Sequence, residues 1–85
     1  MKTFEYTISD PDGIHARPAG LLVKEASKYK STITLTKNGT TADLKRIFSV
    51  MSLGVKSGDT VTVEVTGPDE NPAVEAIKAL FSENL

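Results

Sequence analysis

Cysteine and tryptophan are absent from this 85-residue sequence, and histidine occurs only once. Without cysteine the chain can form neither a disulfide framework nor a thiolate nucleophile. A zinc site takes three or four ligands, mostly cysteine and histidine, so this composition argues against one. We therefore expect no bound metal and no cofactor.

Long apolar runs and an excess of charge of one sign are also missing. No apolar run approaches the ~20 residues of a membrane-spanning helix, and the first residues lack the pattern of a signal peptide. Ten basic residues stand against eleven acidic ones, whereas nucleic-acid binders carry a clustered basic excess. We expect a cytoplasmic protein that neither binds nucleic acid nor inserts into a membrane.

The length of the chain allows one domain, residues 1–85, with a modest core. A domain of this size buries only about 60% of the surface that its unfolded chain exposes. Hydrophobic residues make up 39% and charged residues 25% of the sequence, as in ordinary globular proteins. A large active-site cleft is therefore not expected.

Alternation of apolar and polar residues predicts strands over 4–8, 31–37 and 61–65. Asn38-Gly39 is the strongest short hairpin signal, because both residues tolerate the positive φ of a type I′ turn. A short returning strand over 40–43 should follow this turn.

A helical period of apolar residues appears in three places. The first helix starts near Pro18, the second covers Leu44–Leu53 and ends at Gly54, and the third begins with Asn71-Pro72 as cap and first turn. The order is βαββαβα. With one apolar face per strand and one apolar stripe per helix, this order implies an α+β fold in two layers, with the helices on a single side of the sheet.

The residues best suited to chemistry surround the only histidine. His15 lies in the loop that opens the first helix, and Arg17 follows two positions later. The N-terminal turn of a helix binds anions through free N–H groups and a partial positive charge, and arginine suits phosphate oxygens. Nearby positive charge disfavours imidazolium, so we expect a neutral, nucleophilic His15 that can attack phosphorus at pH 7.

Less specific interpretations stay open at this point. A lone histidine before a helix is often a surface residue or a loose cap, and the spacing His-x-Arg-Pro is not specific by itself. Asp10 and Asp12 could touch a cation, although turn formation explains them better.

The segment Gly13–Ala19 resembles the active-site signature of HPr, the histidine-containing phosphocarrier family of the bacterial phosphoenolpyruvate:sugar phosphotransferase system. The resemblance runs nearly end to end and includes Glu25–Tyr29, the Asn38-Gly39 turn, Leu44-Lys45, Val50–Gly54 and the Asp69-Glu70 helix start. It implies an open-faced β-sandwich, in which three helices cover one face of a four-stranded antiparallel sheet of order 1-4-2-3.

The resemblance also implies a phosphoryl carrier and not an enzyme. His15 would be phosphorylated on Nδ1 by phospho-enzyme I and would pass the phosphoryl group to the IIA domains of sugar permeases. Ala16 and Arg17 would bind the phosphate, and Arg17 would also assist transfer. The phosphate must not be held too tightly, because onward transfer would then slow.

The predicted helix Leu44–Leu53 has apolar residues on too many sides for a helix with one buried face. Either all of them are core, or Phe48 and Met51 form an exposed patch of the kind that marks a docking surface. The family favours docking, which gives the expected partner contacts Gly20, Lys24, Arg46, Ile47, Phe48 and Met51. Lys45 and Arg17 would complete a basic rim that steers acidic partners.

Arg46 departs from the family pattern. Many HPr proteins of Gram-positive bacteria have a phosphorylatable serine at this position, so that regulatory site does not carry over. Ser49 and Ser52 are the nearby hydroxyls.

Two alternatives accompany the leading function of a monomeric sugar-system carrier. One is a regulatory binding module that acts on transcriptional regulators or enzymes, which the retention of both His15 and Arg17 disfavours. The other is a carrier of the nitrogen-related branch, which uses the same chemistry.

Overall fold

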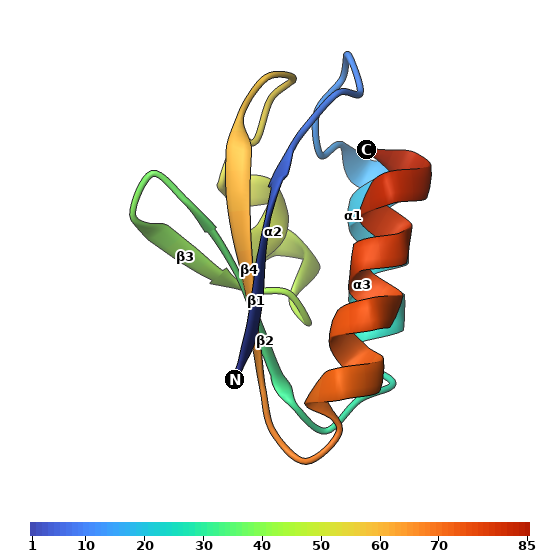
Figure 1. Cartoon of the computed structure of the whole chain (residues 1–85). Coiled ribbons are helices and arrows are strands. Elements are labelled where there is room, and N and C mark those ends of the chain that lie inside the picture. Colours follow the sequence, from blue (N-terminus) through green and yellow to red (C-terminus); the bar gives the residue numbers. More distant parts are fainter.

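The computed structural model describes residues 1–85 as seven elements in the order βαββαβα (Figure 1). The strands are β1 (Lys2–Thr7), β2 (Thr32–Lys37), β3 (Thr40–Asp43) and β4 (Thr60–Thr66). The helices are α1 (Ala16–Ala26), α2 (Ile47–Ser52) and α3 (Glu70–Asn84). None of these helices is long and apolar enough to span a bilayer.

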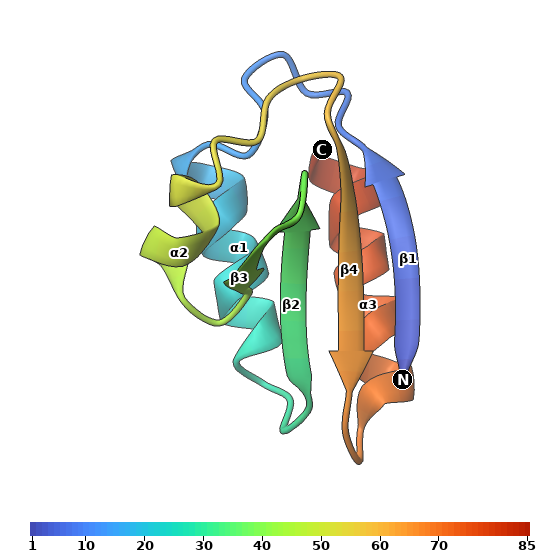
Figure 2. The same ribbon diagram turned by 90° about the vertical axis from the view of Figure 1, so that its left-hand side faces the viewer.

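The four strands form one antiparallel sheet in the order β1-β4-β2-β3 (Figure 2). β4 pairs with β1 on one side and with β2 on the other, so that Val65 lies opposite both Lys2 and Ile33. Helices α1 and α3 lie side by side against one face of the sheet, and the opposite face is uncovered (Figure 1). This confirms the expected α+β open-faced sandwich.

The core lies between the sheet and the two long helices. Phe81 of α3 is fully buried, and its ring meets the rings of Phe4 and Tyr6 edge to face, with centroids 5.7 and 5.4 Å apart. Aromatic pairs favour this geometry. Most of the predicted inward positions are fully buried, among them Ala19, Leu22, Ala26, Ile33, Leu35, Val61, Val63, Val65, Ala73 and Ile77. Four others are half-buried and pack against this core, namely Phe4, Tyr6, Val23 and Leu80.

Helix α2 is shorter than predicted, because it begins at Ile47 and not at Leu44. The N–H of Leu44 donates to the Ile33 carbonyl at 2.9 Å. The N–H of Lys45 donates to Asp43 Oδ1, also at 2.9 Å. These bonds tie the segment to β2 and to a turn, so the buried Leu44 precedes the helix.

Helices α1 and α3 begin at Ala16 and Glu70, earlier than periodicity predicted, and the start of α3 is the one that the family resemblance implied. The cap of α3 is Asp69 and not Asn71, yet the Asp69 side chain makes no cap bond within its own helix. Its carboxylate instead accepts hydrogen bonds from the N–H of Lys30 and from the N–H and hydroxyl of Ser31. The contact between these two loops therefore sets the start of α3.

Candidate functional site

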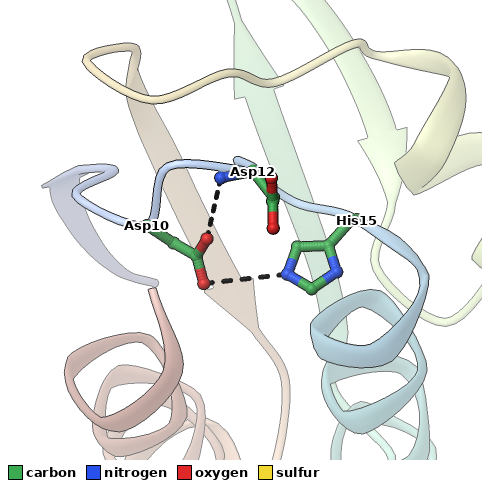
Figure 3. Close-up of side chains that lie close together, drawn as sticks. All are labelled: Asp10, Asp12 and His15. Carbon is green, nitrogen blue, oxygen red and sulfur yellow. Dashed lines mark hydrogen bonds and ion pairs between the residues drawn. The ribbon is translucent and has the colours of Figure 1, made fainter.

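His15 lies where the loop after β1 enters α1 (Figure 3). It is the N-cap residue of the helix, with an extended backbone (φ −91°, ψ −175°), and its ring makes no capping hydrogen bond. The carbonyl of His15 accepts from the Ala19 N–H at 3.0 Å, so the backbone holds the residue while the ring stays free. Its side chain is 36% exposed. The expected position of the histidine at the opening of a helix is confirmed.

The first turn of α1 offers unused donors beside this ring. The N–H groups of Ala16 and Arg17 have no acceptor within the chain, and Pro18 has no N–H to satisfy. The first turn contains no acidic residue, and the Arg17 side chain is exposed. Free N–H groups and the partial positive charge of the helix end allow this turn to bind an anion.

A close backbone contact fixes the loop that carries His15. Gly13 has a positive φ of 64°, and the N–H of Ile14 donates to the Val55 carbonyl at 3.1 Å. A Cβ at position 13 would overlap that carbonyl oxygen, so both the conformation and the contact require glycine. Ile14 itself is buried in the core. The residue next to His15 is thus anchored to the segment between α2 and β4.

Asp10 and Asp12 form an Asx turn in front of the histidine (Figure 3). The N–H of Asp12 donates to Asp10 Oδ1 at 2.8 Å, and the N–H of Gly13 donates to the Asp10 carbonyl at 3.0 Å. This confirms the turn. The other oxygen of Asp10, Oδ2, lies 3.7 Å from Nε2 of His15, a contact that the sequence did not predict. The tight turn immediately before the histidine is the sequence feature that could have indicated this contact, because it folds the chain back.

The ligand atoms of Asp10, Asp12 and His15 lie within 4.8 Å of one another. A zinc ion needs three or four protein ligands, so all three of these residues would have to bind it. Asp10 already uses one oxygen in the turn, and Asp12 is exposed. Turn formation therefore accounts for the Asp10 carboxylate, whereas Asp12 takes part in the turn through its backbone N–H.

Helix α2 presents two apolar side chains to solvent. Phe48 is 85% exposed and Met51 is 40% exposed, whereas Val50 on the same helix is fully buried. Ile47 is half-buried and packs against the core. The expectation of an exposed patch is confirmed for Phe48 and Met51, which we call the α2 patch. It lies on the element next to α1 (Figure 2).

Only some of the basic side chains in the predicted rim are exposed and without a partner in the chain. Lys24 of α1 is exposed, and Arg46 is exposed while its Nε lies 3.7 Å from Asp43 Oδ2. Lys45 is half-buried, because its ammonium donates to the Tyr29 carbonyl at 2.8 Å, so it contributes less to the rim than expected. Gly20 is half-buried, and a Cβ there would meet nothing within 4 Å. Packing within the chain therefore does not require glycine at that position.

The two serines of α2 differ in their surroundings. The hydroxyl of Ser52 donates to the Ser49 carbonyl at 2.9 Å, and Ser52 is exposed. Ser49 is half-buried.

Comparisons with known proteins bear on what this arrangement does. Residues 2–83 match the family described as the PTS HPr component phosphorylation site. The chain is 46% identical to the phosphocarrier protein HPr of Mycoplasma genitalium over 85 residues, which cover 99% of this chain and 97% of that protein.

Solved structures show the same likeness. The histidine-containing phosphocarrier protein of a mycoplasma superimposes with a TM-score of 0.94 at 40% identity, covering 96% of this chain and 93% of that one. The phosphocarrier protein HPr of Bacillus anthracis superimposes with a TM-score of 0.86 at 34% identity, covering 94% of this chain and 95% of that one.

Proposed function

Because this chain belongs to the HPr family, the phosphocarriers of the phosphotransferase system, we propose that His15 is the residue that carries its phosphoryl group. The observation that supports this assignment is the position of the ring at the N-terminus of α1, beside the unused N–H groups of Ala16 and Arg17. These donors can meet the negative charge of a phosphoryl group bound to the ring.

The chemistry needs little beyond this arrangement. A lone pair on Nδ1 of His15 attacks phosphorus, and the bond to the donor breaks with its electron pair passing to the donor. Arg17 adds a cation that stabilises charge on the transferring oxygens. When an acceptor nucleophile attacks, the N–P bond breaks and its electron pair returns to Nδ1. The partly exposed ring can be reached by a donor and an acceptor in turn.

Phospho-enzyme I is the proposed donor, and the IIA domains of sugar permeases are the proposed acceptors. Both would dock on the α2 patch, because Phe48 and Met51 are exposed beside the helix that His15 opens. Ile47, Gly20, Lys24 and Arg46 would surround this contact. A regulatory binding module is not favoured, since a carrier alone has use for the histidine and the donors beside it. A carrier of the nitrogen-related branch would use the same residues.

Labelling with phosphoenolpyruvate and enzyme I tests this proposal. The intact mass should rise by one phosphate, which is labile in acid and stable in base as a phosphoramidate is, and the label should pass on to a IIA domain. His15→Ala should abolish the uptake while circular dichroism shows an intact fold. Uptake of phosphate by the His15→Ala protein would show that another residue is the carrier.

A further inference from the structure

We propose that Asp10 is a positioning residue for phosphoryl transfer: its carboxylate keeps the proton of the His15 ring on Nε2 and so leaves the lone pair on Nδ1. The inference rests on the proposed role of His15. It adds a residue that lies outside α1 and outside the α2 patch.

Three hydrogen bonds hold Asp10 in place. Its N–H donates to the Leu85 carbonyl at 2.9 Å, and its own carbonyl accepts from Gly13 at 3.0 Å. Its Oδ1 accepts from the Asp12 N–H at 2.8 Å. These bonds fix both the backbone and the side chain, and they leave Oδ2 facing the imidazole of His15 (Figure 3). The side chain of Asp10 is only 21% exposed.

The direction of this contact selects one form of the ring. A neutral imidazole carries its proton on one nitrogen and a lone pair on the other, and the partner of one nitrogen decides which. Oδ2 of Asp10 lies 3.7 Å from Nε2, and the second ring nitrogen points away from Asp10 (Figure 3). At 3.7 Å the contact is an electrostatic one and not a direct hydrogen bond. A negative charge at this place favours N–H at Nε2, so the nucleophilic lone pair lies on Nδ1.

The same contact suits the charge that develops during transfer. As the Nδ1 lone pair forms the N–P bond, the bond from phosphorus to the donor breaks and its electron pair leaves with the donor. The ring keeps its Nε2 proton and gains a positive charge, which faces the Asp10 carboxylate. When the acceptor attacks phosphorus, the N–P electron pair returns to Nδ1 and the ring becomes neutral again. No proton has to move in either direction.

Asp12 supplies a matched control within the same turn. Its carboxylate belongs to the same cluster, whose ligand atoms lie within 4.8 Å of one another, but the Asp10 carboxylate is the closer one, with Oδ2 3.7 Å from Nε2. Asp10→Asn and Asp12→Asn therefore each remove one negative charge near His15, and the first removes the one that lies closer to Nε2. An asparagine at position 10 can still accept the turn hydrogen bond through its Oδ1, so the loop is preserved.

Two measurements on the full chain test the proposal. Nitrogen-15 NMR of His15, at a pH where its ring is neutral, gives the ratio of the two tautomers. Single-turnover uptake from phospho-enzyme I gives the rate. Asp10→Asn should raise the fraction of Nδ1–H tautomer and slow uptake by roughly fivefold, the scale of a partly exposed charge contact. Asp12→Asn should change both clearly less, because its carboxylate is farther from Nε2.

Unchanged tautomers and rate in Asp10→Asn would overturn the proposal. Equal effects in the two variants would also overturn it, because they would show a general effect of charge. The NMR measurement needs no partner protein, so it tests Asp10 even if the wild-type chain takes no phosphate from enzyme I. That result would overturn the proposed function of His15 instead.

Discussion

Three side chains at one turn of the chain are proposed to share the work of carrying a phosphoryl group, and each acts on a different atom. In this proposal His15 would supply the nitrogen that bonds to phosphorus and Arg17 would supply charge to the phosphate oxygens, while Asp10 faces the other ring nitrogen, Nε2. None of them is buried in the core. Substitutions at these residues should therefore change transfer far more than stability.

Arg17→Ala should slow phosphoryl transfer and leave the thermal unfolding temperature unchanged, because the side chain is exposed and acts on phosphate charge. Losing one charge-assisted contact costs about 1.5–3 kcal/mol, which corresponds to a rate roughly 10- to 150-fold lower. Single-turnover transfer to a IIA domain measures this effect. Arg17→Lys, which keeps the charge but not the planar fork, should recover part of the rate. Transfer at the wild-type rate in Arg17→Ala would exclude this residue from the mechanism.

At the scale of elements, one face of α2 packs against the core and the other face is exposed to solvent. Val50 is buried against the core, while Phe48 and Met51 are exposed. The same helix thus helps to hold the fold and offers an apolar surface, which is the arrangement expected of a docking helix. Its two faces can be tested separately.

Phe48→Asp should weaken binding of enzyme I and of IIA domains by tenfold or more, roughly the effect of losing an aromatic anchor, without lowering stability by more than about 0.5 kcal/mol. Val50→Asp should instead unfold the domain, because it would bury an unpaired charge. A binding titration beside a thermal melt distinguishes these outcomes. Full affinity in the Phe48→Asp protein would place the docking surface elsewhere.

The elements that could be predicted from the sequence are those fixed by neighbouring residues. The β2–β3 hairpin follows from Asn38-Gly39, which adopt positive φ angles of 49° and 81° as a type I′ turn requires. The alternation around Val63 predicts β4 and its buried face in the same way. Local chemistry also placed His15 at the opening of α1.

The features that sequence could not predict depend on partners distant in the chain. α2 begins late because Leu44 bonds to Ile33, and the Asp69 carboxylate makes no cap bond in α3 because it bonds to Ser31 instead. The contact between Asp10 and His15 likewise needs a loop held by Leu85. Periodicity and turn propensity carry no information about such long-range bonds, so they appear only in the folded structure.

At the scale of the whole molecule, the Asp69 carboxylate joins the end of β4 to the start of β2. The hydrogen bond from the Ser31 hydroxyl, and then the one from the Lys30 N–H, hold the pKa of Asp69 below its ordinary value of 3.8. A depressed pKa in the folded state stabilises the fold above the unfolded pKa, and this contribution is lost as the pH falls through the folded pKa. The contact between these loops is therefore sensitive to acid.

Asp69→Asn should lower the unfolding temperature at pH 7, because the amide NH₂ cannot accept the bond from the Lys30 N–H. The difference from wild type should shrink as the pH falls from 3.8 through the lower pKa of the folded state, because the wild-type carboxylate then becomes protonated. Thermal melts between pH 7 and pH 2 measure this difference. Glu75→Gln, at an exposed position of the same helix, serves as the control and should follow the wild-type curve. A difference in unfolding temperature that stays constant over this pH range would contradict the role assigned to the Asp69 carboxylate.

The position of β4 in the sheet also determines when the protein can fold during its synthesis. β1 and β2 are not neighbours, and β4 alone joins them. β1 therefore has no strand to pair with until β4, which ends at Thr66, has been made. Contacts that close such a long loop are slow to form and come late. The loop that carries His15 lies between β1 and α1 and is hydrogen-bonded to Val55 and Leu85, so we expect it to reach its native form only after these residues have been made.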